Sequence, residues 1–195
     1  MGFRIAKSWN IAGLYFERFA NDVLKNGGSF DCFRVKESGE RYLNREQIKI
    51  EIPPLKEINI NFNFKGEEFA TSSNKLYLRM SENNQPLYDS VCIINDDVST
   101  NKRSKKCKLF LFQHTISATH RTISDPGKAI NPLINEMTTY RNVKKGEIDI
   151  HFFWVIINSQ EYFKPSGVEA LKRCGCNLFI LSLNSLLIQA QQYNY

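Results

Sequence analysis

Hydrophobic and polar positions along the first half of the chain predict one helix followed by a series of strands. Apolar residues recur at helical spacing over residues 11–26, and a Gly-Gly pair follows that should end the helix. Residues 29–36 (SFDCFRVK) alternate as in a strand, and residues 47–52 (QIKIEI) alternate until a Pro-Pro pair breaks the pattern. Two further strands are predicted at 75–80 (KLYLRM) and 87–95 (LYDSVCIIN).

The second half predicts helices between strongly apolar strands. Residues 108–117 (KLFLFQHTIS) begin as an apolar strand and end in polar residues, and a helix is predicted within 125–142. Residues 147–158 (EIDIHFFWVIIN) are apolar almost throughout, which is typical of a strand buried on both faces. A short helix within 166–175 and a strand at 176–184 complete the pattern.

A strand, a helix and a second buried strand of this kind form a right-handed crossover whose two strands are parallel. The expected fold class is therefore α/β: a mixed sheet flanked by helices, with antiparallel strands early in the chain and parallel strands late. A chain of 195 residues with 42% hydrophobic residues suits one domain better than two, so we expect residues 1–195 to form a single domain.

The charge of the chain is locally concentrated. The net charge is +6, and the segment 101–108 (NKRSKKCK) carries five basic residues and no acid. Basic side chains gain affinity for a polynucleotide by releasing counterions, so this segment is a candidate phosphate-contacting surface. A solvated loop is the simpler interpretation, and both remain open. The candidate residues in the segment are Lys102, Arg103, Lys105, Lys106 and Lys108.

Cysteine usage and hydropathy bear on the cellular environment. Five scattered cysteines, an odd number, fit reduced thiols and a reducing compartment better than a disulfide framework. Cys174 and Cys176 resemble half of a zinc site, but no second Cys/His pair with zinc spacing follows them. The chain has no run of about 18 apolar residues, so we expect no transmembrane helix, and the first residues lack the apolar core of a signal peptide.

Three polar residues stand where their surroundings favour apolar ones. Asp89 lies within LYDSVCII, and Gln113 lies at the polar end of LFLFQHT. If the two strands form an antiparallel hairpin, these ends are neighbours. Glu17, beside the apolar stripe of the first helix, is a third candidate oxygen donor for Mg²⁺, which takes one or two carboxylates and keeps several waters. Each residue also has a purely structural interpretation: Asp89 as a turn residue at a strand edge, Gln113 as a hydrogen-bonded strand end, and Glu17 as a surface acid of the helix.

A helix with FE, a strand with YDSV, and the run QHTISATH before a helix follow one another within about residues 10–185. In these features the chain resembles the C-terminal nuclease-like domain of the Crinkler effectors and the related domains of retrotransposon hot spot proteins. Both groups belong to the restriction-endonuclease-like, or PD-(D/E)xK, superfamily. The resemblance implies a restriction-endonuclease-like sheet and a Mg²⁺- or Mn²⁺-dependent DNA endonuclease with little sequence specificity.

The resemblance also assigns roles. It implies Glu17 as the helix acid and Asp89 as the metal-binding aspartate. Gln113 stands where the superfamily usually has its second acid, and Thr115 stands where it has a lysine. Gln113 offers a carbonyl oxygen without a charge, and Thr115 supplies no positive charge. The metal ligands implied are Asp89, Gln113 and Glu17.

Two residues are candidates to replace the missing charge. Lys128 opens the next helix, and His120 lies just past the strand, where an imidazole can orient a water or contact phosphate. Arg121 joins the expected DNA-contacting residues. A solvated lysine and a turn histidine are equally good interpretations, and His114 and His151 are more simply read as structural. The alternative for the whole set is a degenerate nuclease fold that acts as a DNA-binding or protein-interaction module.

Partners and location follow from the resemblance. It implies a secreted effector that acts in the nucleus of a host cell, with DNA as partner through backbone contacts, which position a protein without specifying sequence. Restriction-type nucleases that cut both strands often pair, so a homodimer is one expectation. No membrane partner is expected.

Overall fold

A computed structural model of the chain describes residues 3–36, 45–60, 75–80, 87–95, 107–116, 125–141, 143–157 and 163–183. It is a mixed α/β fold whose strands form one sheet of eight, in the order β2-β1-β8-β7-β6-β5-β4-β3. The strands are β1 (Gly28–Arg34), β2 (Gln47–Ile52), β3 (Lys56–Ile60), β4 (Lys75–Met80), β5 (Ser90–Asn95), β6 (Cys107–Thr115), β7 (Ile148–Ile156) and β8 (Cys176–Ser182).

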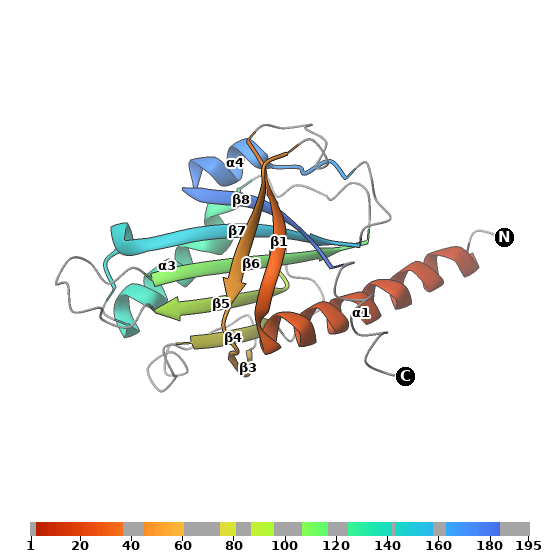
Figure 1. Cartoon of the computed structure of the whole chain (residues 1–195), viewed down its shortest axis with the longest axis horizontal. Helices are drawn as coiled ribbons and strands as arrows, with labels where there is room; N and C mark the ends of the chain where they lie inside the picture. The colour runs from red at the N-terminus through yellow and green to blue at the C-terminus, as the bar shows by residue number, and fades with distance from the viewer. Residues whose placement is uncertain are drawn as a thin grey trace.

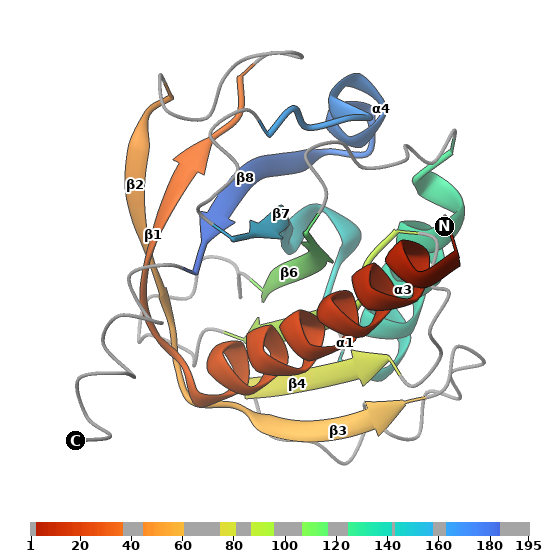
Figure 2. The ribbon, with the colours of Figure 1, turned by 90° about the vertical axis from the view of Figure 1, so that its right-hand side faces the viewer.

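The sheet is curled, and helices cover both of its faces (Figures 1 and 2). Helix α1 (Phe3–Asn26) lies inside the curl, and its N-terminal end extends past the sheet. Helices α3 (Gly127–Tyr140) and α4 (Val168–Arg173) lie on the outer face, and the 3₁₀ turn η2 (Lys145–Glu147) leads into β7. None of the helices in the described residues is long and apolar enough to cross a membrane.

Each face of the sheet has its own hydrophobic core. Phe16, Ala20 and Leu24 of α1 pack inside the curl against alternate residues of the strands, such as Phe112 and Phe153. On the outer face, residues of α3 and α4 pack against the intervening strand positions. Because successive side chains of a strand point to opposite faces, β6 and β7 are apolar at nearly every position.

The structure confirms most of the elements that the sequence predicts. The strands β5 and β6 form the expected antiparallel hairpin, and β6, α3 and β7 form the expected crossover with parallel strands. The predicted strand at 75–80 matches β4 residue for residue. None of the five cysteines forms a disulfide in the described part of the chain.

Three expectations need correction. Helix α1 begins at Phe3 and not near residue 11, so the helix is longer than its amphipathic pattern predicts. The division into early antiparallel and late parallel strands is incomplete, since β3 pairs parallel to β4 and β1 pairs antiparallel to β8. Strand β5 begins at Ser90, so Asp89 precedes the strand and does not lie within it.

A glycine turn holds the C-terminal end of α1 against the sheet. Gly27 has a φ of +74°, a conformation that side chains with a Cβ rarely adopt. Its neighbours leave no room for one, because a Cβ would lie 2.5 Å from the Ile52 carbonyl oxygen. The Leu55 N–H also donates to the Lys25 carbonyl at 3.0 Å, so the chain after β2 closes over the helix end.

We expect Gly27→Ala to lower the free energy of unfolding by about 2 kcal/mol or more, because it adds both a backbone penalty and a clash. Urea unfolding followed by circular dichroism measures the change. Gly146→Ala is the matched control, since a Cβ there meets nothing within 4 Å. Equal stability of the two variants would show that the turn does not hold α1 in place.

Candidate functional site

Asp89 closes the open end of the β5–β6 hairpin. Its N–H donates to the Phe112 carbonyl at 2.8 Å, and its Oδ2 accepts a hydrogen bond from the His114 N–H at 2.6 Å. The carboxylate thus takes the acceptor position that a backbone carbonyl has within a ladder. Ser90 pairs with Phe112 in the register, so Asp89 lies beside the Gln113 end of β6, as the sequence predicts.

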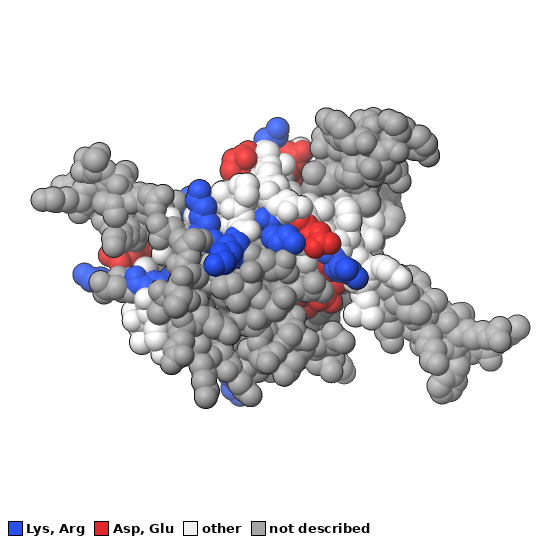
Figure 3. Space-filling view, turned by 90° about the horizontal axis from the view of Figure 1, so that it is seen from below, with Lys and Arg blue, Asp and Glu red and all other residues white. Residues whose placement is uncertain are grey.

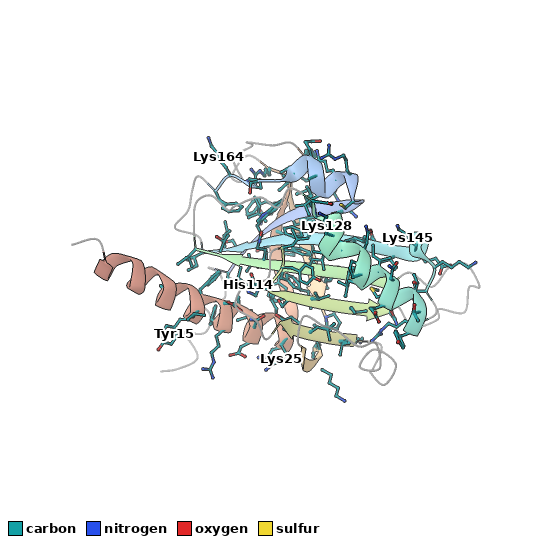
Figure 4. All side chains as sticks on the ribbon, turned by 180° about the vertical axis from the view of Figure 1, so that it is seen from behind. Tyr15, Lys25, His114, Lys128, Lys145 and Lys164 are labelled. Atoms are coloured by element: carbon teal, nitrogen blue, oxygen red, sulfur yellow. The ribbon has the colours of Figure 1, made fainter. Side chains whose placement is uncertain are left out.

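Helix α1 brings Glu17 to the same place. Phe16 is buried, and its ring meets the His114 ring edge-on at 6.4 Å. Tyr15 is 73% exposed and points away from the sheet (Figure 4). Glu17, which follows Phe16, is partly buried and close enough for its charge to raise the pKa of Asp89.

The electrostatic state of Asp89 is unusual for a carboxyl group. The pKa of Asp89 is raised from 3.8 to about 7, mainly because the carboxyl group is buried; the hydrogen bond from the His114 N–H lowers the pKa, and the charge of Glu17 raises it. About 25% of the side chain remains exposed. A divalent cation between the two carboxylates would offset both the desolvation and their repulsion. Two carboxylates are also as many as a protein usually offers Mg²⁺.

His114 lies on the same face of the sheet as Glu17. Its side chain is 1% exposed, and its Nδ1 is 3.8 Å from Asp89 Oδ2. Figure 4 shows it where β6 reaches α1. The structure therefore places it inside a strand, next to the candidate carboxylates.

Gln113 and Thr115 lie on the other face. Both are buried, and the alternation of β6 puts them with Leu111 on the side that α3 covers. The partner of Gln113 in β7 is Trp154, which also belongs to the outer core. Lys128 is exposed on the first turn of α3 (Figure 4). The structure thus brings Asp89, Glu17 and His114 together, and it separates Glu17 from Gln113, Thr115 and Lys128.

The predicted DNA-contacting residues are only partly described. Lys108, on β6, lies at the opposite end of the strand from His114, about 20 Å away at roughly 3.3 Å per residue. On the face seen in Figure 3, basic side chains lie beside acidic ones and form no continuous basic surface among the coloured residues. The following candidates lie outside the described residues: Lys102, Arg103, Lys105, Lys106, His120 and Arg121.

A hydrogen-bonded group under α1 is not evident from the sequence. The Tyr77 hydroxyl donates to Asn21 Oδ1 at 2.5 Å and lies 2.8 Å from Ser90 Oγ. Asn21 follows Glu17 by one helical turn, and Ser90 follows Asp89 directly. The only hint in the sequence is the apolar face of α1, which Asn21 interrupts.

A second polar cluster lies at the other end of β7. Asp149 Oδ2 is 2.9 Å from His151 Nε2, and Asn177 Nδ2 donates to Asp149 Oδ1 at 3.0 Å. The His151 ring stacks on Phe179 at 5.5 Å. Burial lowers the pKa of His151; the charge and hydrogen bond of Asp149 oppose this, and the charges of Lys108 and Arg34 add to it. This cluster lies near Lys108 and far from Asp89.

Comparisons with protein-family models, with curated proteins and with solved structures gave no match to this chain. Among the described residues, no group of three or more His, Cys, Asp or Glu side chains is arranged to hold a metal ion. The candidate site therefore rests on its own geometry.

We expect Asp89→Asn to stabilise the folded chain at pH 8. The unfolded carboxyl ionises near pH 4 and the folded one near pH 7, so wild-type stability falls as the pH rises between these values. The full difference corresponds to roughly 4 kcal/mol, and water contact reduces it, so we expect a gain of about 2 kcal/mol at pH 8 and almost none at pH 4.

Urea unfolding at the two pH values measures this gain. The control is Asp22→Asn, which removes an exposed carboxylate from α1 without relieving any burial. Loss of stability in Asp89→Asn at pH 8 would mean that the ionised carboxylate stabilises the strand end, and that Asp89 has an ordinary structural role.

Proposed function

We propose that this chain is a divalent-metal-dependent nuclease whose metal ion, Mg²⁺ or Mn²⁺, binds between Glu17 and Asp89. The observation that carries the proposal is the approach of two partly buried carboxylates at the end of a hairpin, where the charge of Glu17 raises the pKa of Asp89. The order of helix α1, hairpin β5–β6, helix α3 and parallel strand β7 also suits the restriction-endonuclease-like core that the sequence resemblance implies.

The carboxylate oxygens of Glu17 and Asp89 are of the chemical type that binds Mg²⁺ or Mn²⁺. Carboxylate oxygens are the ligands that Mg²⁺ prefers, and it completes its shell with water and substrate phosphate. Gln113 is the third oxygen donor that the resemblance implies. Its place on the α3 side of the sheet gives Glu17 and Asp89 the larger part in this proposal.

In this proposal the metal would polarise the scissile phosphate and lower the pKa of an attacking water. The protein positions the groups around it. The His114 N–H holds Asp89 Oδ2 in a fixed direction, and the His114 ring packs beside Phe16 where α1 meets the strand. Lys128 and Thr115 lie on the α3 side of the sheet. They would contact the substrate only where a nucleic-acid strand passes the end of β6.

A binding module is the second candidate. Thr115 stands where the superfamily has a lysine, and it offers no charge to stabilise the transition state. A fold with this site would still bind a polynucleotide and a metal while cutting poorly. DNA as partner, action in a host nucleus and pairing into a homodimer belong to the proposal on the resemblance alone.

We expect wild-type protein to bind one Mn²⁺ and to nick supercoiled plasmid only when Mg²⁺ or Mn²⁺ is present. Glu17→Gln and Asp89→Asn each remove one charged ligand, so each should weaken Mn²⁺ binding at least about tenfold and abolish nicking. Calorimetry measures the binding, and gel electrophoresis measures the nicking.

Asp22→Asn again serves as the control, because it removes an exposed acid of the same helix. It should bind and nick as the wild type does. Nicking without metal binding at Glu17 and Asp89 would contradict the proposal. Metal binding without nicking would favour the binding module.

A further inference from the structure

The buried group formed by Tyr77, Asn21 and Ser90 connects three elements. Tyr77 lies on β4, Asn21 on α1 and Ser90 at the start of β5. All three are at most 2% exposed. A tyrosine hydroxyl has a single hydrogen, which it gives to Asn21 Oδ1, so Ser90 Oγ donates the second hydrogen bond to it.

Each end of this group lies next to a candidate carboxylate. Asn21 and Glu17 are one turn apart on α1, so they share a face of the helix. Ser90 follows Asp89 directly, and its side chain points into the curl of the sheet, toward Tyr77. The hydrogen bonds of Tyr77 therefore join the helix that carries Glu17 to the strand that Asp89 begins.

Stability alone does not account for this group. Asn21 is buried, and its Nδ2 has no hydrogen-bond partner among the described residues, which is costly in an apolar core. The adjoining α1 positions that face the sheet are apolar, as in Ala20 and Leu24. An apolar residue at position 21 would pack there without such a cost, but it would not fix the helix relative to Ser90.

We propose that Tyr77 is a positioning residue, whose hydroxyl joins Asn21 to Ser90 and so holds Glu17 beside Asp89. The proposal rests on the proposed function, since that function is what requires the two carboxylates to meet. It adds a residue, from a strand outside the hairpin, whose removal should change metal binding without touching a ligand.

The test uses Tyr77→Phe, which keeps the ring and removes only the hydroxyl. We expect its affinity for Mn²⁺ to fall about tenfold, as is typical when a hydrogen bond behind a metal ligand is lost. Tyr88→Phe is the matched control. Tyr88 is also a buried tyrosine with one hydroxyl hydrogen bond, to the Ala129 carbonyl at 3.4 Å, but it lies on the outer face of the sheet.

A second measurement needs no metal. Urea unfolding of Glu17→Gln, Asp89→Asn and the double variant gives the coupling free energy between the two carboxylates. We expect Tyr77→Phe to reduce this coupling by more than half, because α1 is then free to move Glu17 away from Asp89. Tyr88→Phe should leave the coupling unchanged.

The two measurements separate the two proposals. If the wild type binds no Mn²⁺, the metal-dependent function fails, and the coupling alone decides the role of Tyr77. Unchanged coupling in Tyr77→Phe would overturn the positioning role whatever the metal result. A loss of affinity or of coupling equal in Tyr77→Phe and Tyr88→Phe would also overturn it, because both would then reflect a general loss of packing.

Discussion

The architecture depends on a sheet that is buried on both faces. Helix α1 fills the inside of the curl, and α3 and α4 cover the outside, so the central strands are largely buried on both faces. An ionisable group within such a strand would lose its hydration on either side. Several polar groups therefore lie near the ends of strands: Asp89 directly precedes β5, and His114 is the penultimate residue of β6.

Asp89 occupies such a position, directly before β5, where its carboxylate is held in place but its charge is unfavourable. Its neighbours Tyr88 and Ser90 point to opposite faces, one bonded to α3 and the other, through Tyr77, to α1. The carboxylate between them is held rigidly by the His114 N–H, although burial and Glu17 make its charge unfavourable. Strain of this kind is a common mark of a functional position, because binding a cation relieves it.

Much of the fold was predictable because local patterns and global packing agree. The apolar runs of β6 and β7 and the proline before α3 point to a crossover with a doubly covered sheet. The approach of Asp89 to the end of β6 followed from hairpin geometry. The sequence did not reveal which face each residue takes: Gln113 and Thr115 point to α3, and His114, between them, points to α1. Nor could spacing reveal that Tyr77 and Asn21 meet, because 56 residues separate them.

A crystal soaked in Mn²⁺ gives the most direct test that the carboxylates of α1 and the hairpin form one metal site. Data collected near the manganese absorption edge locate the ion without reference to activity. The account predicts an anomalous peak at about 2.0–2.2 Å from oxygens of both Glu17 and Asp89, as for a hard cation of similar size. A peak at Asp149 and His151 instead, or none beside Asp89 in a crystal that binds Mn²⁺ elsewhere, would contradict it.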